Sequence, residues 1–193
     1  MRGRPIEHDE NEVILNAQKV FWERGYAATS LNDLKDATQL GSSSLYNTFK
    51  GGKKELFSKA IQQRRADFNE FKHQLSQSKN PLALIKDFFY LLADANTAVH
   101  KRGCIIANSV TELAFIDAEL EQEAIQILLD VEDMFTAAIS HAQRNNIITT
   151  KTNARVLGRY LITVWNGLNV TRRMHPDAAS LKPLIRLQLS VLS

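Results

Sequence analysis

Residues 30 to 57 constrain the fold most, because they predict two short helices joined by a tight turn. Ser30 is a favourable N-cap for the first helix, and Asp33 stands three residues later, as in a capping box. Leu40 is the apolar residue inside the turn, and the second helix is expected over residues 42 to 48. Apolar residues at helical spacing give both helices an inner side: Leu31, Leu34, Ala37, Leu45 and Phe49. The segment therefore predicts a helical hairpin with a polar outer side.

The rest of the sequence also predicts helices, since strand-like alternation is absent from its long segments. The polar run SQSKNP at residues 76 to 81 interrupts the pattern. Further helices are expected over 8–24, 53–76, 81–100, 105–115, 117–145, 152–174 and 177–192. The expected fold is all-α, with about nine helices.

Composition excludes several classes of protein. A hydrophobic content of 44% is too high for a disordered chain, and no apolar run approaches the ~20 residues that a membrane span needs. The charged N-terminus is not a secretory signal, and the single Cys104 fits a reducing compartment, so a cytoplasmic protein is expected. The histidines are scattered, and neither a glycine-rich phosphate loop nor a nucleophile motif is present, so we expect no enzyme, metal or cofactor.

Positive charge is concentrated around the hairpin. Residues 41 to 65 contain six Lys or Arg residues against one acid, Glu55. Such a cluster is typical of a phosphate-binding face, although a solvated helix surface has the same composition.

The outer side of the second short helix carries small polar side chains of the kind that approach base edges. Asn can bond adenine in a bidentate manner, and Ser or Thr can donate or accept at several bases. Backbone N–H groups and the helix dipole favour a phosphate at the helix start, at Thr29 and Ser30. The neighbouring lysines would neutralise the charge of the DNA backbone. The candidate DNA contacts are Arg2, Arg4, Thr29, Ser30, Ser42, Ser43, Ser44, Tyr46, Asn47, Thr48, Lys50, Lys53 and Lys54. The alternative from these features is an ordinary helical hairpin with a solvent-facing second helix.

The chain resembles the TetR family of transcriptional repressors from Phe21 through Phe57. The matching features are FxxxGYxxTSLxDL, the alanine at 37, the apolar turn residue at 40, LYNTF at 45–49 and KELF at 54–57. The arm RGRP at 2–5 and the stretch RGCIIANSVTELA at 102–114 are also similar to family members. The resemblance implies a helix-turn-helix DNA-binding domain over 1–52 and a helical ligand-binding and dimerisation domain over 53–193.

Two positions depart from the family pattern. Gln39 stands in the turn where family members usually carry Gly, which accepts a positive φ without steric cost. The linker FKGGKKELF is about one residue longer than the commonest spacing, so either Lys53 or Lys54 is expected to take the usual phosphate-contacting role.

The resemblance further implies a homodimer and an effector pocket. The predicted dimer interface consists of Val156, Tyr160, Val164, Gly167, Leu168, Leu181, Leu184, Ile185, Gln188 and Leu192, although these stripes equally suit the core of one subunit. The candidate pocket residues, each equally suited to plain core, are Phe88, Phe89, Leu92, Cys104, Phe115, Leu128, Met134, Phe135 and Trp165. Cys104 follows two cations, Lys101 and Arg102, which favour a thiolate, but it also suits a buried small hydrophobe.

The leading hypothesis is therefore a homodimeric repressor that binds a palindromic DNA operator and is released by a small molecule. The alternative is a helical protein-interaction module whose DNA-reading unit has decayed, which the residue at position 39 and the serine-rich helix motivate.

Overall fold

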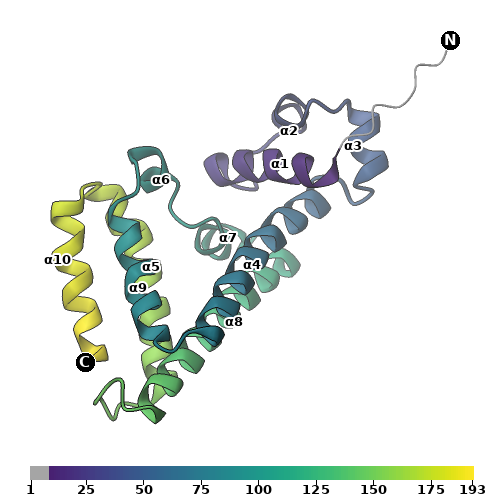
Figure 1. The fold of residues 1–193 in the computed structure, drawn as a ribbon. Helices are drawn as coiled ribbons and strands as arrows, with labels where there is room; N and C mark the ends of the chain where they lie inside the picture. The colour runs from purple at the N-terminus through teal and green to yellow at the C-terminus, as the bar shows by residue number, and fades with distance from the viewer. Residues whose placement is uncertain (1–8) are drawn as a thin grey trace.

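The computed structural model describes residues 9–193, and within them the fold is all-α, as predicted (Figure 1). The helices are α1 (Glu10–Arg24), α2 (Leu31–Thr38), α3 (Ser42–Thr48), α4 (Gly52–Gln77), α5 (Pro81–Ala93), α6 (Thr97–Arg102), α7 (Ile105–Leu113), α8 (Ala118–Arg144), α9 (Ala154–Met174) and α10 (Ala178–Leu189), followed by a short 3₁₀ turn, Ser190–Leu192. None of these helices combines the length and the apolar character that a membrane span requires.

The three N-terminal helices form a small unit at one end of the molecule (Figure 1). Phe21 of α1, Leu34 of α2, and Leu45 and Phe49 of α3 are fully or almost fully buried, so the inner face predicted from spacing is the face that packs. α4 then runs from this unit along α8 into the C-terminal helices, and Phe57 near its start meets Phe21 edge-to-face at a centroid distance of 5.0 Å. One long helix therefore belongs to the packing of both ends.

Local signals set the ends of α2. The hydroxyl of Ser30 accepts a hydrogen bond from the backbone N–H of Asp33, while the Asp33 carboxylate accepts one from the N–H of Ser30, so the predicted capping box is present. Gln39 ends the helix with φ +58°, in the left-handed region. The turn therefore has the backbone conformation that favours glycine, although the residue is Gln. The side-chain amide of Gln39 donates to the carbonyl of Asp36.

The C-terminal helices pack around the pair α8 and α9. Gly158 of α9 lies so close to α8 that an added Cβ would sit 2.2 Å from Thr136 Oγ1 and 3.0 Å from the carbonyl oxygen of Glu132. The Arg159 guanidinium also donates to both carboxylate oxygens of Glu132, at 3.2 and 3.3 Å. A close backbone approach and an ion pair thus hold the two longest C-terminal helices together.

The single helix predicted over 81–100 is wrong, because the chain forms α5 and α6 there with a break at residues 94–96. The Asn96 side chain accepts a hydrogen bond from the N–H of Val99 and so starts a new helix. The apolar periodicity hid this N-cap.

Candidate nucleic-acid interface

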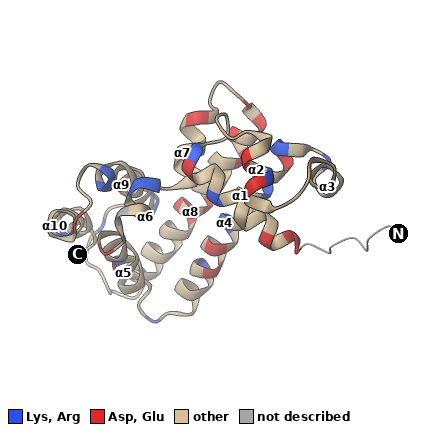
Figure 2. Cartoon of the chain, turned by 90° about the horizontal axis from the view of Figure 1, so that it is seen from above, with Lys and Arg blue, Asp and Glu red and all other residues tan. Residues whose placement is uncertain are grey.

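α3 presents a polar, uncharged outer side at the extremity of the molecule. Ser43, Ser44, Tyr46, Asn47 and Thr48 are exposed. Ser42 is half-buried, and the inner residues of the helix are held in the core. Figure 2 shows α3 in tan throughout, since it carries neither a basic nor an acidic residue. The structure therefore anchors this helix on one side and leaves its small polar side chains open for contact.

Two predicted contacts instead stabilise the start of α2. Thr29 is buried. Its hydroxyl donates to the backbone carbonyl of Gly25 at 2.6 Å, and its N–H donates to the backbone carbonyl of Tyr26 at 3.3 Å. The Thr29 hydroxyl therefore stabilises the loop before α2, and the phosphate contact predicted for Thr29 at the helix start stays a prediction. The Ser30 hydroxyl is engaged with Asp33, to whose carboxylate it donates at 2.7 Å.

The lysines at the start of α4 take different directions. Lys54 points towards α8, with Nζ 2.9 Å from a carboxylate oxygen of Asp117 and 2.8 Å from one of Glu119, and these hydrogen bonds raise the pKa of Lys54. Lys53 Nζ lies 4.6 Å from the ring centroid of Tyr26 and 3.4 Å from the carbonyl oxygen of Ala27, and burial lowers its pKa. Of the two, Lys53 is the lysine beside the loop between α1 and α2.

Most of the basic residues counted from sequence over 41–65 are paired with carboxylates. Besides Lys54, Lys59 contacts Glu10 at 2.7 Å. Arg64 contacts Asp67 and Arg65 contacts Asp130. Within residues 9–193, Lys50 and Lys53 are the two basic residues of this segment without an ion pair. The predicted contacts Arg2 and Arg4 lie outside the described residues.

Four aromatic residues of the predicted effector pocket pack against one another. Phe88 stacks on Phe71 and on Trp165, with ring centroids 5.0 and 4.9 Å apart. Phe89 and Phe135 are fully buried beside it, and Cys104 is a buried free cysteine at the N-cap of α7. Leu92 and Leu128 are half-buried against the core, and Met134 lines a small pocket of about 260 Å³.

Phe115 is wrong as a pocket residue. Its side chain is fully exposed, at 103% of the reference area, because α7 ends at Leu113 and the turn to α8 directs residue 115 outwards.

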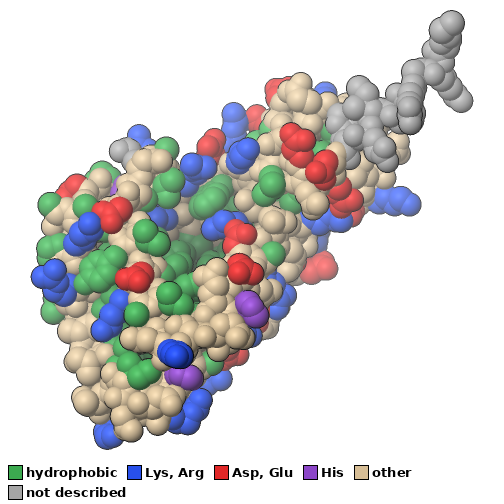
Figure 3. Space-filling view, viewed as in Figure 1, with side chains coloured by type: hydrophobic (Ala, Val, Ile, Leu, Met, Phe, Trp, Pro, Cys, Tyr) green, Lys and Arg blue, Asp and Glu red, His purple; other side chains and the backbone are tan. Residues whose placement is uncertain are grey.

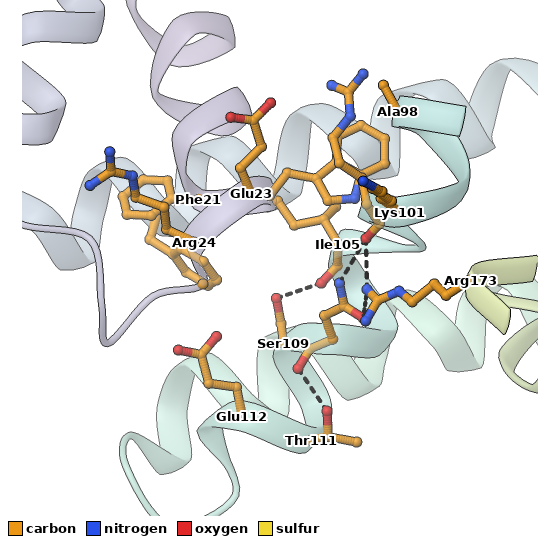
Figure 4. A pocket seen from close by; sticks show the side chains of 15 residues that line it. Phe21, Glu23, Arg24, Ala98, Lys101, Ile105, Ser109, Thr111, Glu112 and Arg173 are labelled. Carbon is orange, nitrogen blue, oxygen red and sulfur yellow. Dashed lines mark hydrogen bonds between the residues drawn. The ribbon is translucent and has the colours of Figure 1, made fainter. Parts of the chain in front are cut away.

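A different pocket, of about 600 Å³, lies between the N-terminal unit and the C-terminal helices (Figure 4). It is lined from α1, α4, α6, α7 and α9 by Phe21, Trp22, Glu23, Arg24, Gly25, Phe57, Ala98, Lys101, Arg102, Ile105, Asn108, Ser109, Thr111, Glu112 and Arg173. None of these was predicted as a pocket residue. The lining comes from distant parts of the sequence, so no local pattern indicates it.

Glu112 joins this pocket to the helix-turn-helix unit. Its two carboxylate oxygens accept hydrogen bonds from the backbone N–H groups of Tyr26 at 2.9 Å and Ala27 at 2.7 Å. An added Cβ at Gly25 would lie 2.7 Å from this carboxylate. Since Gly25 also has φ +82°, the loop after α1 accepts the carboxylate only with glycine at this position.

Half of the predicted dimer residues belong to the core of the chain itself. Val164, Leu168, Leu181, Ile185 and Leu192 are buried, so the prediction is wrong for them as an outer surface. Val156 and Gly167 are exposed, whereas Tyr160, Leu184 and Gln188 are half-buried. Tyr160 donates its hydroxyl to the carbonyl of Gln188 and thereby ties α9 to α10.

The exposed face of α9 contains two of the predicted residues, Val156 and Gly167, together with residues that were not predicted. Val156, Thr163, Gly167, Val170 and Met174 follow at spacings of three, four and seven, which places them on one outward face. On α10, Leu187 is 70% exposed, and Figure 3 shows apolar side chains gathered over α10 and α5. Sequence reasoning included Val156 and Gly167 but not Thr163, Val170 and Met174, because α9 has apolar residues on several sides and most of the large ones are buried.

Comparisons with known proteins agree with the geometry. The family model for bacterial regulatory proteins of the tetR family matches residues 14–60, and that for the tetracyclin repressor-like C-terminal domain matches residues 82–187. The chain is 26% identical to the transcriptional repressor ComR of Escherichia coli K12, over 96% of this chain and 88% of that protein. It is 29% identical to the uncharacterised regulator YezE of Bacillus subtilis, over 98% of this chain and 99% of that protein.

A solved structure has the same fold. A cysteine mutant of the TetR family regulator CifR, complexed with 26 bp of operator DNA, superimposes with a TM-score of 0.79 at 20% identity, covering 99% of this chain and 100% of that chain. Since the C-terminal family model alone covers more than half of the sequence, and the N-terminal one covers the helix-turn-helix, the protein belongs to the TetR family of bacterial regulatory proteins.

Proposed function

We propose that the protein is a homodimeric cytoplasmic repressor that binds a palindromic DNA operator and is released by a small molecule. The observation that carries the proposal is α3, which is buried on one side and exposes only small polar and aromatic side chains on the other. The relative ComR is named as a transcriptional repressor, which supports repression over activation.

In this proposal α3 enters the major groove, with Ser43 and Asn47 on base edges. Lys50 and Lys53 contact the phosphates on either side of it, and Tyr46 gives its hydroxyl to a phosphate. Residues 1–52 then make the DNA-binding domain and residues 53–193 the ligand-binding and dimerisation domain. Two copies on a two-fold axis read two half-sites about 34 Å or a multiple of this apart.

The exposed faces of α9 and α10 supply the dimer contact in this proposal. Val170 is 60% exposed and Met174 69%, and such neighbouring apolar residues favour association. Val170→Asp should give a monomer by light scattering at micromolar concentration. Leu129→Asp, at an exposed apolar residue on α8, is the matched control and should stay dimeric. A dimer in both variants would place the interface elsewhere.

DNA binding is tested by selecting duplexes from a random pool with the full chain and measuring affinity by fluorescence anisotropy. Ser43→Glu places a negative charge on the outer side of α3, where it still suits the first turn of a helix. We expect at least a hundredfold loss of operator affinity. Ser76→Glu adds the same charge at an exposed position near the far end of α4 and should bind as the wild type does. Equal affinity of both variants, or no sequence preference over random competitor, would reject the proposal and favour an interaction module that does not read DNA.

A further inference from the structure

The pocket between the two units combines an apolar wall with a group of cations (Figure 4). Its volume of about 600 Å³ lies within the usual ~300–1,000 Å³ range of small-molecule sites. Trp22, Phe57 and Ile105 provide apolar surface, and the C-terminal side adds Lys101, Arg102 and Arg173.

The three cations have no carboxylate partner among residues 9–193. Arg173 instead donates to the carbonyl of Arg102 at 2.9 Å and to Asn108 Oδ1 at 3.2 Å. Figure 4 shows its guanidinium reaching from α9 into the pocket. Like charges gathered in a concave site create a positive potential that an anion relieves.

Glycine at 103 is required for this placement. Gly103 has φ +66°, and an added Cβ would lie 2.8 Å from the guanidinium of Arg173. The arginine therefore lies across the turn between α6 and α7, held by neutral oxygens alone. This arrangement keeps its charge uncompensated at the pocket wall.

The two acids in the lining do not neutralise this group. Glu112 uses both oxygens for the N–H groups of Tyr26 and Ala27, and Figure 4 shows Glu23 directed away from Arg173. On the apolar side, the Trp22 ring lies 5.3 Å from the guanidinium carbon of Arg102, while its Nε1 has no acceptor within the described chain. The pocket thus offers a basic end beside an aromatic surface.

We propose that this pocket binds a small organic carboxylate with an apolar body, the carboxylate at Lys101, Arg102 and Arg173 and the body against Trp22 and Ile105. The pocket is lined from α1 on one side and from α6, α7 and α9 on the other, so its occupant contacts both units at once. A ligand that contacts two units stabilises the arrangement in which both contacts are made. The resulting coupling to DNA affinity rests on the proposed function, whereas binding itself does not.

Binding is measured by calorimetry on the full chain without DNA, using benzoate, 2-naphthoate and decanoate, each against its uncharged amide. We expect at least one acid to bind in the micromolar to low millimolar range and its amide about tenfold more weakly, because charge-assisted hydrogen bonds are lost. Arg173→Gln and Lys101→Gln should each weaken the acid about tenfold and leave the amide unchanged. Lys151→Gln, at an exposed cation in the loop before α9, is the matched control.

The proposal is overturned if no acid binds in this range, if acid and amide bind equally, or if the control variant loses as much affinity as Arg173→Gln. A second titration measures the affinity for the selected operator with and without the acid. An unchanged operator affinity would overturn the coupling. Acid binding by a protein that reads no DNA sequence would reject the repressor function and leave this site standing.

Discussion

The carboxylate of Glu112 is the contact through which α7 holds the loop between α1 and α2. The variant Glu112→Gln measures how much this contact contributes to the free energy of unfolding. The wild-type carboxylate accepts two backbone N–H groups at 2.9 and 2.7 Å. An amide keeps one acceptor and turns its NH₂ group towards a donor, so one hydrogen bond is lost and the other loses its charge. A hydrogen bond to a charged group contributes about 1.5–3 kcal/mol and a neutral one about half as much. The two terms sum to about 2–4 kcal/mol. Because the Ala27 amide is exposed and water can replace part of its bond, we expect a loss of about 2–3 kcal/mol.

For a chain of this length, such a loss lowers the melting temperature by about 4–12 °C if the two units unfold together. Hydrogen exchange gives the sharper assay, because the amides of Tyr26 and Ala27 are the groups released. Their protection should fall first, while the amides inside α8 keep theirs. The matched control is Glu70→Gln, at an exposed glutamate that accepts a 3.3 Å hydrogen bond from Gln74 within α4. Unchanged protection of both loop amides in Glu112→Gln would refute the reasoning.

Three further perturbations follow from the geometry. Gln39→Gly relieves a left-handed residue and should raise the free energy of unfolding by about 1 kcal/mol in a denaturant titration, and a loss would show that the side-chain hydrogen bond to the Asp36 carbonyl of α2 outweighs the strain. Gly158→Ala drives a methyl into Thr136 and the α8 backbone and should cost about 1–3 kcal/mol, whereas an unchanged melting temperature would mean that the two helices separate freely. The hydrogen bond from Lys54 lowers the pKa of Asp117 below its ordinary value of 3.8, so its contribution is present above that pH and is lost as the pH falls through the depressed pKa. Asp117→Asn should therefore lower the free energy of unfolding at pH 7 to 8 and leave it nearly unchanged below the depressed pKa, so that stability falls less steeply in acid; an equal loss at every pH would contradict this.

Sequence reasoning succeeded where the signal is local. The capping box at Ser30 and the inner faces of α2 and α3 each involve neighbours within a few positions, so the pattern carries them. The left-handed backbone of Gln39 has no such signal in its own residue type, and only the family resemblance pointed to that position. The same logic missed the start of α6, because the polar residues around Asn96 also suit the outer side of one longer helix.

Sequence reasoning failed where the exposure of a residue depends on which helix covers which face of its neighbour. Leu168 and Val170 are both apolar residues of α9, yet one is buried and the other is 60% exposed, because α8 covers only one side. The interdomain pocket unites Trp22, Glu112 and Arg173, which have no sequence relation to one another. Such sites emerge from tertiary packing alone.

The ion pairs along α4 bear on how this protein responds to ionic strength. Residues 41 to 65 contain six cations around α3 and the start of α4, but Lys54, Lys59, Arg64 and Arg65 already have carboxylate counterions from the protein itself. DNA releases a condensed counterion when an unpaired cation of the protein neutralises a phosphate, and this release makes the affinity depend on salt. Two free lysines a subunit, or four in a symmetric pair, correspond to a slope of about −4 in a plot of log affinity against log salt, where the raw count would give about −11. The affinity that this segment contributes would then fall only slowly as the salt concentration rises. Discrimination between base sequences would depend on the uncharged side chains of α3.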